Sequence, residues 1–388
     1  MRSRRVAVLT TGRQDYGILR SSLLMFRDAP DFELIILAGG MHLSARFGKT
    51  IDVIRGDGFV VHHELNFLDE PPEPCADAAR AALLVGDTLT VERPDALILV
   101  GDRSETLAAG LAATVERVPI VHVHGGEESE GAIDNAQRHA LTKLSHLHLV
   151  SHELHARRVR QMGEAPENVV VVGAPGLDNM YRSDLPGRRA LEEDLGLRLE
   201  SPVILVTMHA ATLEADPAAE TVAVSQAMET VPATYIITQP NADTGGDAIL
   251  AHWRRWVENQ PAAKLLPALG ERRYWALLQL SDAILGNSSS AIIEAPAAGV
   301  PSIDVGTRQK GRLRHPSTLH VPAEPTAIAD ALRASLDPAA REEVRRQEPL
   351  FPAGAAAPRV VAAIRDWQPP RPPRKLFYWS ECVAPSLS

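Results

Sequence analysis

The sequence has few cysteines and few aromatic residues. Cys75 and Cys382 are the only cysteines among its 388 residues, and Phe, Trp and Tyr together make up 4% of the chain. Two cysteines do not provide a disulfide framework or a cysteine-based zinc site. We therefore expect a fold held together by its hydrophobic core, in a reducing compartment, and we predict a cytoplasmic protein.

Long hydrophobic runs are also missing. No apolar stretch approaches the roughly 20 residues of a membrane-spanning helix. The apolar run that follows the basic start "MRSRR" is too short for a secretory signal and is typical of a first strand. Acidic residues outnumber basic ones by 49 to 40, giving a net charge of -9, which argues against an extended nucleic-acid surface. We expect no membrane or nucleic-acid partner, so any phosphate site must be local.

Short apolar runs alternate with longer segments in which apolar residues recur three and four positions apart. Most of the short runs are continuously hydrophobic, which is typical of parallel strands covered on both faces. The predicted strands are residues 5–10, 32–38, 59–65, 95–102, 119–126, 147–151, 168–173, 202–208, 234–240, 263–266, 282–287 and 301–306. In the second half, helical patterns fall at residues 217–230, 245–258, 271–280, 289–298 and 325–336. Repeated strand–helix alternation predicts an α/β, doubly wound fold.

The alternation is interrupted at residues 179–201, which are polar and include Pro186 and Gly187. A chain of this length exceeds one typical core, so we predict two Rossmann-like domains, at residues 1–180 and 200–350. Residues 351–388 are rich in proline, and we expect them to form a tail that packs over the surface. Ligands of such sheets bind beyond the carboxyl ends of the strands, so the predicted site is the cleft between the domains.

Two turns in the first half carry candidate site residues. Arg13 follows the first predicted strand in "TTGRQDYG", which lacks the G-x-G-x-x-G fingerprint of a dinucleotide site. Asp102 and Arg103 follow the strand at 95–102. Asp102 either caps the next helix or directs its carboxylate into the cleft.

The segment "HVHGGEESEGAIDN" concentrates titratable side chains. It contains His122, His124, Glu127 and Asp134. The spacing of the histidines does not match the helical H-E-x-x-H metal motif, and either histidine alone fits a structural role. Together with the nearby carboxylates they predict an acid–base site. Arg138 lies one helical turn beyond Asp134, where an ordinary i,i+4 ion pair is the simpler explanation.

Polar residues also follow the strands of the second half. His209 and Asn241 each follow one strand, and "GNSSSAIIE" follows another. A helix starting after these serines would direct its N–H groups and its dipole at an anion, with the hydroxyls as further donors. Glu294 lies one turn further on and could accept hydrogen bonds from a ribose. A basic run that begins at Arg308 is either a solvated face or a counter-charge for a diphosphate. This half therefore predicts a nucleotide-diphosphate site, and the reactant would be a nucleotide sugar.

At this point the motifs resemble a known family, the hydrolysing UDP-N-acetylglucosamine 2-epimerases, in the branch that feeds sialic-acid-like nonulosonate synthesis. The resemblance covers roughly residues 5–350 and rests on many motifs in order: "TGRQDYGILR", "GDRSETLAA", "PIVHVHGGEESEGAIDNAQRHALTKLSHLHLV", "VGAPGLDN", "VTMHAATLE", "QPNADTGG", "GERRYWALL" and "GNSSSAIIEAPAAGVPSIDVGTRQKGR". It implies a GT-B-like fold with two Rossmann-like domains facing an interdomain cleft. It also implies a homodimer that uses no metal and no nicotinamide or other cofactor.

The resemblance implies a reaction in which the C2 proton of the sugar is removed, the nucleoside diphosphate leaves from C1, and water adds to the resulting glycal. The product is a C2-inverted free sugar such as N-acetylmannosamine. The catalytic residues would be Asp102, His124 and Asp134, with His209 near the leaving diphosphate. The substrate- and nucleotide-binding residues would be Arg13, Arg103, Glu127, Asn241, Arg272, Asn287, Ser288, Ser289, Ser290, Glu294 and Arg308.

Two positions depart from the family's pattern. Many members have a catalytic glutamate in place of His124, and an acidic residue is expected in place of Asn135. A histidine can also transfer protons near neutral pH. His124 therefore either replaces the catalytic glutamate or marks a different sugar, such as a 2,4-diacetamido-6-deoxyhexose. Two alternative functions remain open: a GT-B glycosyltransferase and a non-catalytic nucleotide-sugar-binding protein.

Overall fold

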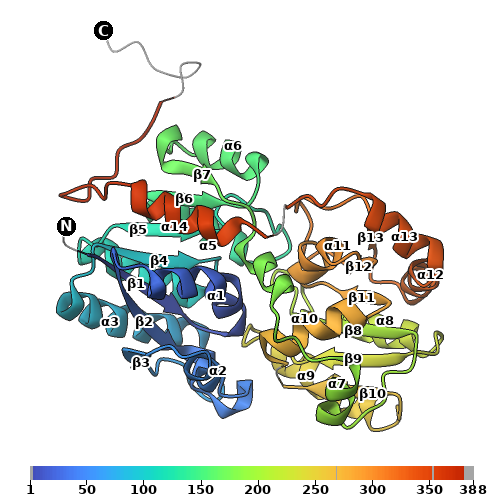
Figure 1. The fold of residues 1–388 in the computed structure, drawn as a ribbon. Coiled ribbons are helices and arrows are strands. Elements are labelled where there is room, and N and C mark those ends of the chain that lie inside the picture. The colour runs from blue at the N-terminus through green and yellow to red at the C-terminus, as the bar shows by residue number, and fades with distance from the viewer. Residues whose placement is uncertain (1–2, 268, 352–353, 380–388) are drawn as a thin grey trace.

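The computed structural model describes residues 3–267, 269–351 and 354–379. Two α/β units lie side by side, each with a central sheet between layers of helices (Figure 1). The last nine residues of the predicted tail, 380–388, lie outside the described residues, and Cys382 is one of them. The predicted fold class, two Rossmann-like doubly wound domains, is confirmed.

The first domain is built on a parallel sheet with the strand order β3-β2-β1-β4-β5-β6-β7. Its strands are β1 (Arg4–Thr10), β2 (Phe32–Gly39), β3 (His63–Leu65), β4 (Ala96–Val100), β5 (Ile120–Val123), β6 (Leu147–Val150) and β7 (Val169–Val171). Its helices are α1 (Arg13–Asp28), α2 (Ile51–Gly56), α3 (Pro74–Glu92), α4 (Ser104–Val115), α5 (Asp134–Leu144), α6 (Glu153–Gln161) and α14 (Ala356–Asp366).

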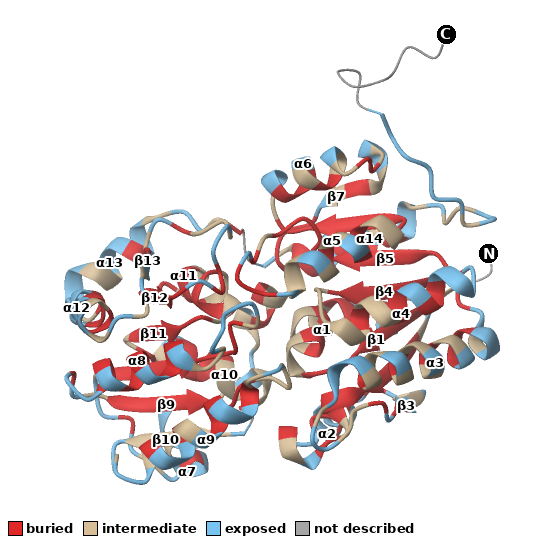
Figure 2. Cartoon of the chain, turned by 180° about the vertical axis from the view of Figure 1, so that it is seen from behind, coloured by how far each residue is buried: buried red, intermediate tan, exposed pale blue. Residues whose placement is uncertain are grey.

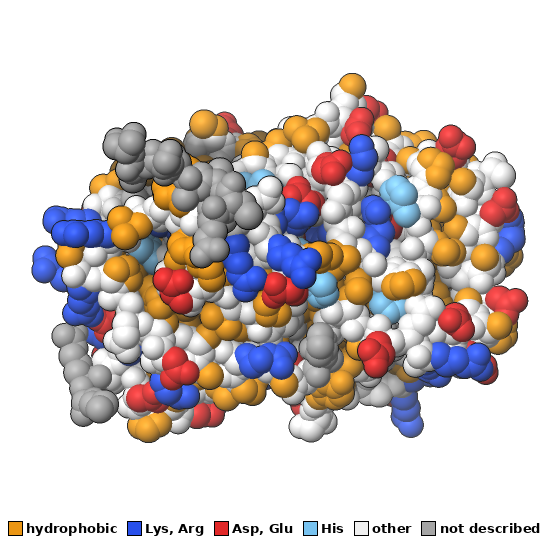
Figure 3. All heavy atoms as spheres, turned by 90° about the horizontal axis from the view of Figure 1, so that it is seen from above, with side chains coloured by type: hydrophobic (Ala, Val, Ile, Leu, Met, Phe, Trp, Pro, Cys, Tyr) orange, Lys and Arg blue, Asp and Glu red, His pale blue; other side chains and the backbone are white. Residues whose placement is uncertain are grey.

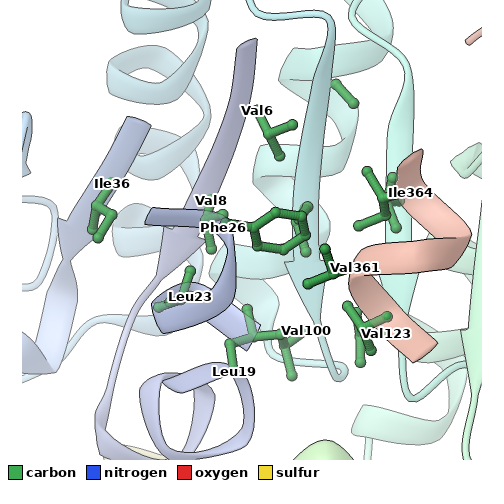
Figure 4. Close-up of a cluster of buried hydrophobic side chains, with 14 of the residues drawn as sticks. Val6, Val8, Leu19, Leu23, Phe26, Ile36, Val100, Val123, Val361 and Ile364 are labelled. Carbon is green, nitrogen blue, oxygen red and sulfur yellow. The ribbon is translucent and has the colours of Figure 1, made fainter. Parts of the chain in front are cut away.

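Each face of this sheet is covered by helices, which explains the continuously apolar strands. In β1, Val6 and Val8 pack toward one face, in a core shared with α1 and α14 (Figure 4). Ala7 and Leu9 of the same strand pack toward the other face, against α3 and α4. Because successive side chains of a strand point to opposite faces, a strand buried on both sides must be apolar at every position.

The second domain repeats this plan, with the strand order β10-β9-β8-β11-β12-β13, again all parallel. Its strands are β8 (Val203–Thr207), β9 (Thr234–Thr238), β10 (Ala263–Leu266), β11 (Ala283–Gly286), β12 (Ser302–Val305) and β13 (Thr318–Val321). Its helices are α7 (Arg188–Leu195), α8 (Ala219–Met228), α9 (Gly246–Val257), α10 (Gly270–Leu280), α11 (Glu294–Ala297), α12 (Pro325–Ser335) and α13 (Pro338–Arg346).

The strands of the two sheets fall within the predicted ranges 1–180 and 200–350, and the exact boundaries stay a prediction. In both sheets the chain order reverses between the first strand and its inner neighbour, at β1/β4 and at β8/β11. Ligands of doubly wound folds bind at this point, beyond the carboxyl ends of the strands. The topology therefore directs two such edges toward the space between the domains.

The structure differs from the predictions in several elements, and α7 and α13 lie outside the predicted helical segments. The helix predicted at 289–298 is a single turn of 3-10 helix, η5 (Ser289–Ala291), followed by the four-residue α11. Pro296 lies in α11, and its lack of an N–H removes a helical hydrogen bond. The strand β13 was not predicted, because "TLHV", at the edge of the sheet, is a short run in which polar and apolar residues alternate.

The predicted surface tail also differs from the structure. Within it, α14 runs beside α1, and Val360, Val361 and Ile364 are completely or almost completely buried (Figures 1 and 4). These side chains fill the core of the first domain, so the chain returns to that domain after completing the second. Beyond α14 the described residues are largely exposed (Figure 2).

Charged side chains of both signs are interspersed with apolar ones over the face seen in Figure 3. Within the described residues, no helix combines the length and the hydropathy that crossing a membrane requires.

Candidate active site

A cavity of about 270 Å³ lies between the two domains, at the carboxyl ends of their inner strands. Most of the predicted site residues line it: Arg13, Asp102, Arg103, His124, Glu127, Asp134, His209, Asn241, Ser288, Ser289, Ser290, Glu294 and Arg308. They come from the loops and first helical turns that follow β1, β4 and β5 in the first domain and β8, β9, β11 and β12 in the second. The topology thus gathers residues from across the sequence around one space.

Two predicted binding residues do not line the cavity. The guanidinium of Arg272 is about half exposed and pairs with Asp184, with Nε–Oδ2 at 3.1 Å. Asn287 is completely buried behind the cavity wall, where its amide accepts from the His209 N–H at 2.7 Å and donates to the His209 carbonyl at 2.9 Å. Asn287 therefore fixes the backbone of His209 and does not face the space where a ligand would bind.

Asp102 directs its carboxylate into the cavity and does not cap the next helix. The N-cap residue of α4 is Arg103, which makes no side-chain capping bond. The Asp102 carboxylate accepts a hydrogen bond from Arg138, a buried arginine of α5. Burial raises the pKa of Asp102, but the charge and hydrogen bond of Arg138 outweigh burial and hold that pKa below its usual value. Asp102 is therefore a stable carboxylate at neutral pH.

Asp134 occupies the first turn of α5, and its pKa is shifted in the opposite direction from that of Asp102. Its Oδ2 lies 3.3 Å from Nη2 of Arg308, across the cleft, so Asp134 does not form the simple i,i+4 pair with Arg138. Burial and the nearby Asp102 carboxylate raise the pKa of Asp134 to about 7. A carboxyl group with a pKa near neutrality can both accept and donate a proton at physiological pH.

His124 directly follows β5 and adopts a left-handed backbone conformation with φ of 66°. This region is unfavourable for a residue with a side chain, and such strain is concentrated at functional sites. The Nδ1 atom of His124 lies 2.7 Å from Oε1 of Glu127. The other ring nitrogen, Nε2, is buried and has no hydrogen-bond partner among the described residues.

His209 follows β8 and is held as a neutral ring. Burial, followed by the charges of Arg308, Arg13 and Arg103, lowers the pKa of His209 well below its usual value. Its Nδ1 accepts from the backbone N–H of Asn241 at 3.3 Å, which leaves the ring proton on Nε2. His209 can therefore offer a neutral N–H donor to a ligand in the cavity.

The serine turn after β11 presents hydroxyl groups and little helix. Ser288 accepts from the N–H of Ser290 at 3.4 Å, and the Ser290 hydroxyl contacts the hydroxyl of Tyr274. Because η5 and α11 are short, the predicted contribution of a helix dipole is not available here. Glu294 lies beside the turn with its Oε2 buried and unpartnered within the described part of the chain, and burial raises its pKa. Hydroxyls and a carboxyl group with spare hydrogen-bonding capacity suit a polar ligand.

Several lining residues were not singled out from the sequence as site residues. They include Asp15, Arg138, Glu271, Tyr274 and Arg312. Arg138 was assigned to an ordinary ion pair, and Arg312 was one charge in a basic run. The hydroxyl of Tyr274 lies on the first turns of α10, within the quoted motif "GERRYWALL", which was the available signal. Among the residues that the structure describes, no three His, Cys, Asp or Glu side chains are grouped to hold a metal ion.

Fold and site together define a two-domain α/β protein of GT-B-like architecture, with acid–base side chains on one wall of an interdomain cavity and hydroxyl and basic groups on the other. The chain belongs to the UDP-N-acetylglucosamine 2-epimerase family, whose model matches residues 25–365. The family expected from the sequence motifs is confirmed.

Curated relatives align over most of the chain. A UDP-N,N'-diacetylbacillosamine 2-epimerase (hydrolyzing) from Legionella pneumophila is 34% identical over 344 residues, covering 86% of this chain and 89% of the relative. The polysialic acid biosynthesis protein P7 of Escherichia coli is 32% identical, covering 86% of each chain. A GDP/UDP-N,N'-diacetylbacillosamine 2-epimerase (hydrolyzing) from Campylobacter jejuni is 32% identical, covering 81% of this chain and 83% of the relative.

Solved structures share the fold. The crystal structure of UDP-GlcNAc 2-epimerase from Neisseria meningitidis bound to UDP-GlcNAc matches with a TM-score of 0.78. The match covers 93% of this chain and 99% of that chain at 17% identity. At this identity the likeness shows the architecture alone.

Proposed function

We propose that the protein is a hydrolysing nucleotide-sugar 2-epimerase that converts a UDP-linked 2-acetamido sugar into UDP and the C2-inverted free sugar. The observation that carries the proposal is the composition of the cavity walls. The first domain contributes the proton-transfer candidates Asp134 and His124, and the second contributes the serine turn, His209 and Arg308. Family membership and the names of the relatives support the same reaction.

The reaction balances without an oxidant or reductant. A base takes the proton from C2, the C2–H electron pair forms a C1=C2 double bond, and the C1–O bond breaks as UDP leaves. Water then adds its oxygen to C1 of the glycal, and C2 receives a proton on the opposite face. Two proton-transfer groups are therefore needed, one for each face of the ring, together with donors for the departing diphosphate.

The described geometry supports a division of these roles. Asp134, with its pKa near 7, serves as one proton-transfer group, and His124, with its free Nε2, serves as the other. Asp102 stays charged beside Asp134 and keeps the pKa of Asp134 high. The neutral His209 donates through Nε2 to the leaving diphosphate, where the positive charge of Arg308 adds stabilisation.

The sugar is proposed to be UDP-N-acetylglucosamine or a UDP-2,4-diacetamido-6-deoxyhexose. The relatives from Legionella pneumophila and Campylobacter jejuni, named for UDP-diacetylbacillosamine, favour the second. The Escherichia coli relative, named for polysialic acid biosynthesis, favours a place in the same kind of nonulosonate synthesis. A homodimer and a cytoplasmic location stay predictions, and sedimentation would test the dimer.

The test incubates the protein with each nucleotide sugar in D₂O, without an acceptor, and follows UDP release and the NMR spectrum of the sugar. We expect stoichiometric UDP and a C2-inverted product that carries deuterium at C2. Absence of both UDP release and C2 deuteration would favour a glycosyltransferase. Binding by calorimetry with no turnover of any nucleotide sugar would favour a binding protein.

A further inference from the structure

Two loops from different domains clasp one another beside the cavity. They are residues 127–133, after β5, and residues 307–312, after β12. The N–H of Glu130 donates to the carbonyl of Lys310 at 2.9 Å. The approach is so close at Gly131 that a Cβ atom there would lie 2.5 Å from the carbonyl oxygen of Thr307. We call these two segments the clasp, and both halves of it carry residues that line the cavity.

Arg312 belongs to the second-domain half of the clasp and reaches a carboxylate of the first. Its guanidinium donates to Oε2 of Glu127, while its Nη1 donates to Oε1 of Gln309 at 3.0 Å. The Glu127 side chain is 2% exposed. Burial alone would raise the pKa of Glu127, but the charge of Arg312 and the hydrogen bond from His124 outweigh it and hold that pKa well below its usual value. Glu127 is therefore a buried carboxylate whose charge is balanced from the opposite domain.

The other carboxylate oxygen of Glu127, Oε1, fixes the ring orientation and the tautomer of His124. Oε1 of Glu127 accepts from Nδ1 of His124 at 2.7 Å and from the hydroxyl of Ser151 at 3.0 Å. An ionised carboxylate only accepts hydrogen bonds, so the ring proton of a neutral His124 resides on Nδ1. Nε2 then carries the lone pair, and no described residue donates a hydrogen bond to it. The ring is thus fixed in orientation and in tautomer with a free basic nitrogen on a residue that lines the cavity.

We propose that Arg312 is a positioning residue that acts through Glu127 on His124, so that the proton-transfer group is aligned only when the two domains are clasped. The proposal rests on the proposed function for the role of His124. It differs from the simpler assignment, in which Arg312 is one of several cations that bind the diphosphate directly. The two assignments place the effect of Arg312 in different steps: proton transfer or nucleotide binding.

The first experiment compares Arg312→Met and Arg312→Lys with the control Lys310→Met. Lys310 also crosses the clasp, to Glu130, but this ion pair is exposed and Lys310 does not line the cavity. For Arg312→Met we expect kcat to fall about 100-fold, because general acid–base groups contribute at least that much. We expect the UDP dissociation constant, measured by calorimetry, to change by less than about threefold. Arg312→Lys should recover part of kcat, and Lys310→Met should stay within about twofold of wild type.

An Arg312→Met variant that keeps its kcat, or that binds UDP about tenfold or more weakly, would overturn the proposal. Thermal unfolding shows whether the variant is folded. If Arg312→Met does not fold, Arg312→Lys decides the question by the same comparison of kcat with UDP affinity.

A double-mutant cycle tests whether Arg312 and Glu127 act as one unit. Glu127→Gln should lower kcat as much as Arg312→Met does, and the double variant should be no worse than either single one. If the two losses multiply, Arg312 acts independently of Glu127. That result would contradict the proposal that Arg312 acts through Glu127 on His124.

Histidine ¹⁵N NMR gives a readout that does not depend on turnover. The His124 signals, assigned by their loss in His124→Asn, should show the Nδ1–H tautomer in wild type and a changed tautomer population in Arg312→Met. An unchanged spectrum would overturn the proposal. If wild type releases UDP from no nucleotide sugar, the proposed function fails, whereas the NMR comparison still decides whether Arg312 aligns the ring.

Discussion

Asp102 and Asp134 are carboxyl groups of one cavity whose surroundings move their pKa values in opposite directions. Arg138 holds the pKa of Asp102 low, whereas burial and the Asp102 charge raise the pKa of Asp134 to about 7. Two groups separated in this way can hold different protonation states at one pH. Acid–base chemistry at neutral pH requires such a division.

The first prediction follows from this pair. Asp134 accepts a proton only when ionised, so kcat/KM of wild type should fall as the pH drops through about 7. Asp102→Asn removes one cause of the raised Asp134 pKa, so the acidic limb of the residual activity should move to lower pH. The value of kcat should fall, because the pKa of Asp134 is then no longer matched to neutral pH.

The pH–rate profiles of both enzymes provide the measurement. Glu130→Gln is the control, because Glu130 precedes Asp134 on the loop after β5 and has a half-exposed side chain that pairs with Lys310. An acidic limb that stays in place in Asp102→Asn would contradict the electrostatic link between the carboxyl groups. An unchanged rate would exclude a catalytic role for Asp102.

Residues that immediately follow a strand could be placed from the sequence. Asp102, His124 and His209 lie at strand ends, and parallel strands direct those ends to one edge of each sheet. Arg138 and Arg312 could not be placed, because their partners lie 36 and 185 positions away. A long arginine side chain reaches whichever carboxylate the fold brings near, and the sequence of a single helix or loop does not contain that information.

Among the elements, α14 illustrates how tertiary packing decides the role of a segment. Its sequence lies in a proline-rich region, yet Val361 and Ile364 complete the core against α1 (Figure 4). The proline content indicated a tail that packs over the surface. The apolar spacing of "VVAAI" was the signal of a buried helix. The segment 289–298 is the opposite case, because a helix was predicted there and the structure has only two short helical pieces. Pro296 interrupts the helix.

The second prediction concerns α14. Ile364→Ala should lower the free energy of unfolding by about 3 kcal/mol, because it removes buried methylene and methyl groups and leaves a cavity. The control Ala362→Ser alters an exposed position of the same helix and should change stability by less than about 0.5 kcal/mol. Denaturant unfolding measures both, and equal effects would mean that α14 is not part of the core.

The third prediction concerns the clasp. Gly131→Ala introduces a Cβ atom where the Thr307 carbonyl lies, so the two loops must separate. We expect kcat/KM to fall by about 100-fold, because displacing catalytic groups by about 1 Å costs that much. Gly56→Ala, where a Cβ atom would meet nothing within 4 Å, should leave kinetics unchanged. Wild-type kinetics in Gly131→Ala would show that the close contact is not required.

At the scale of the whole molecule, the two-domain architecture and the cleft could be predicted because strand–helix alternation is repeated along the chain and is interrupted once. The contacts that hold the domains together could not. Arg308 with Asp134, Arg103 with Asp243 and Arg312 with Glu127 each cross between domains. These pairs depend on the relative placement of two separately folded sheets, which local patterns do not determine.

The fourth prediction concerns ligand binding by the whole protein. At a free concentration of 100 times its dissociation constant, UDP should stabilise the fold by about 2.7 kcal/mol, seen as a raised melting temperature. Uridine at the same concentration should raise the melting temperature much less, because the serine turn, His209 and Arg308 would bind the diphosphate. An equal shift with uridine would indicate that the diphosphate makes no important contact.

The return of the chain through α14 has a consequence for dissecting this protein. The second domain is inserted between β7 and the last core helix of the first, so neither end of the chain can be cut to isolate the first domain intact. A fragment that stops near residue 350 retains both sheets but leaves an apolar groove on α1 open, and it should aggregate. Isolating the first domain requires excising the insert and rejoining the flanking segments with a short linker.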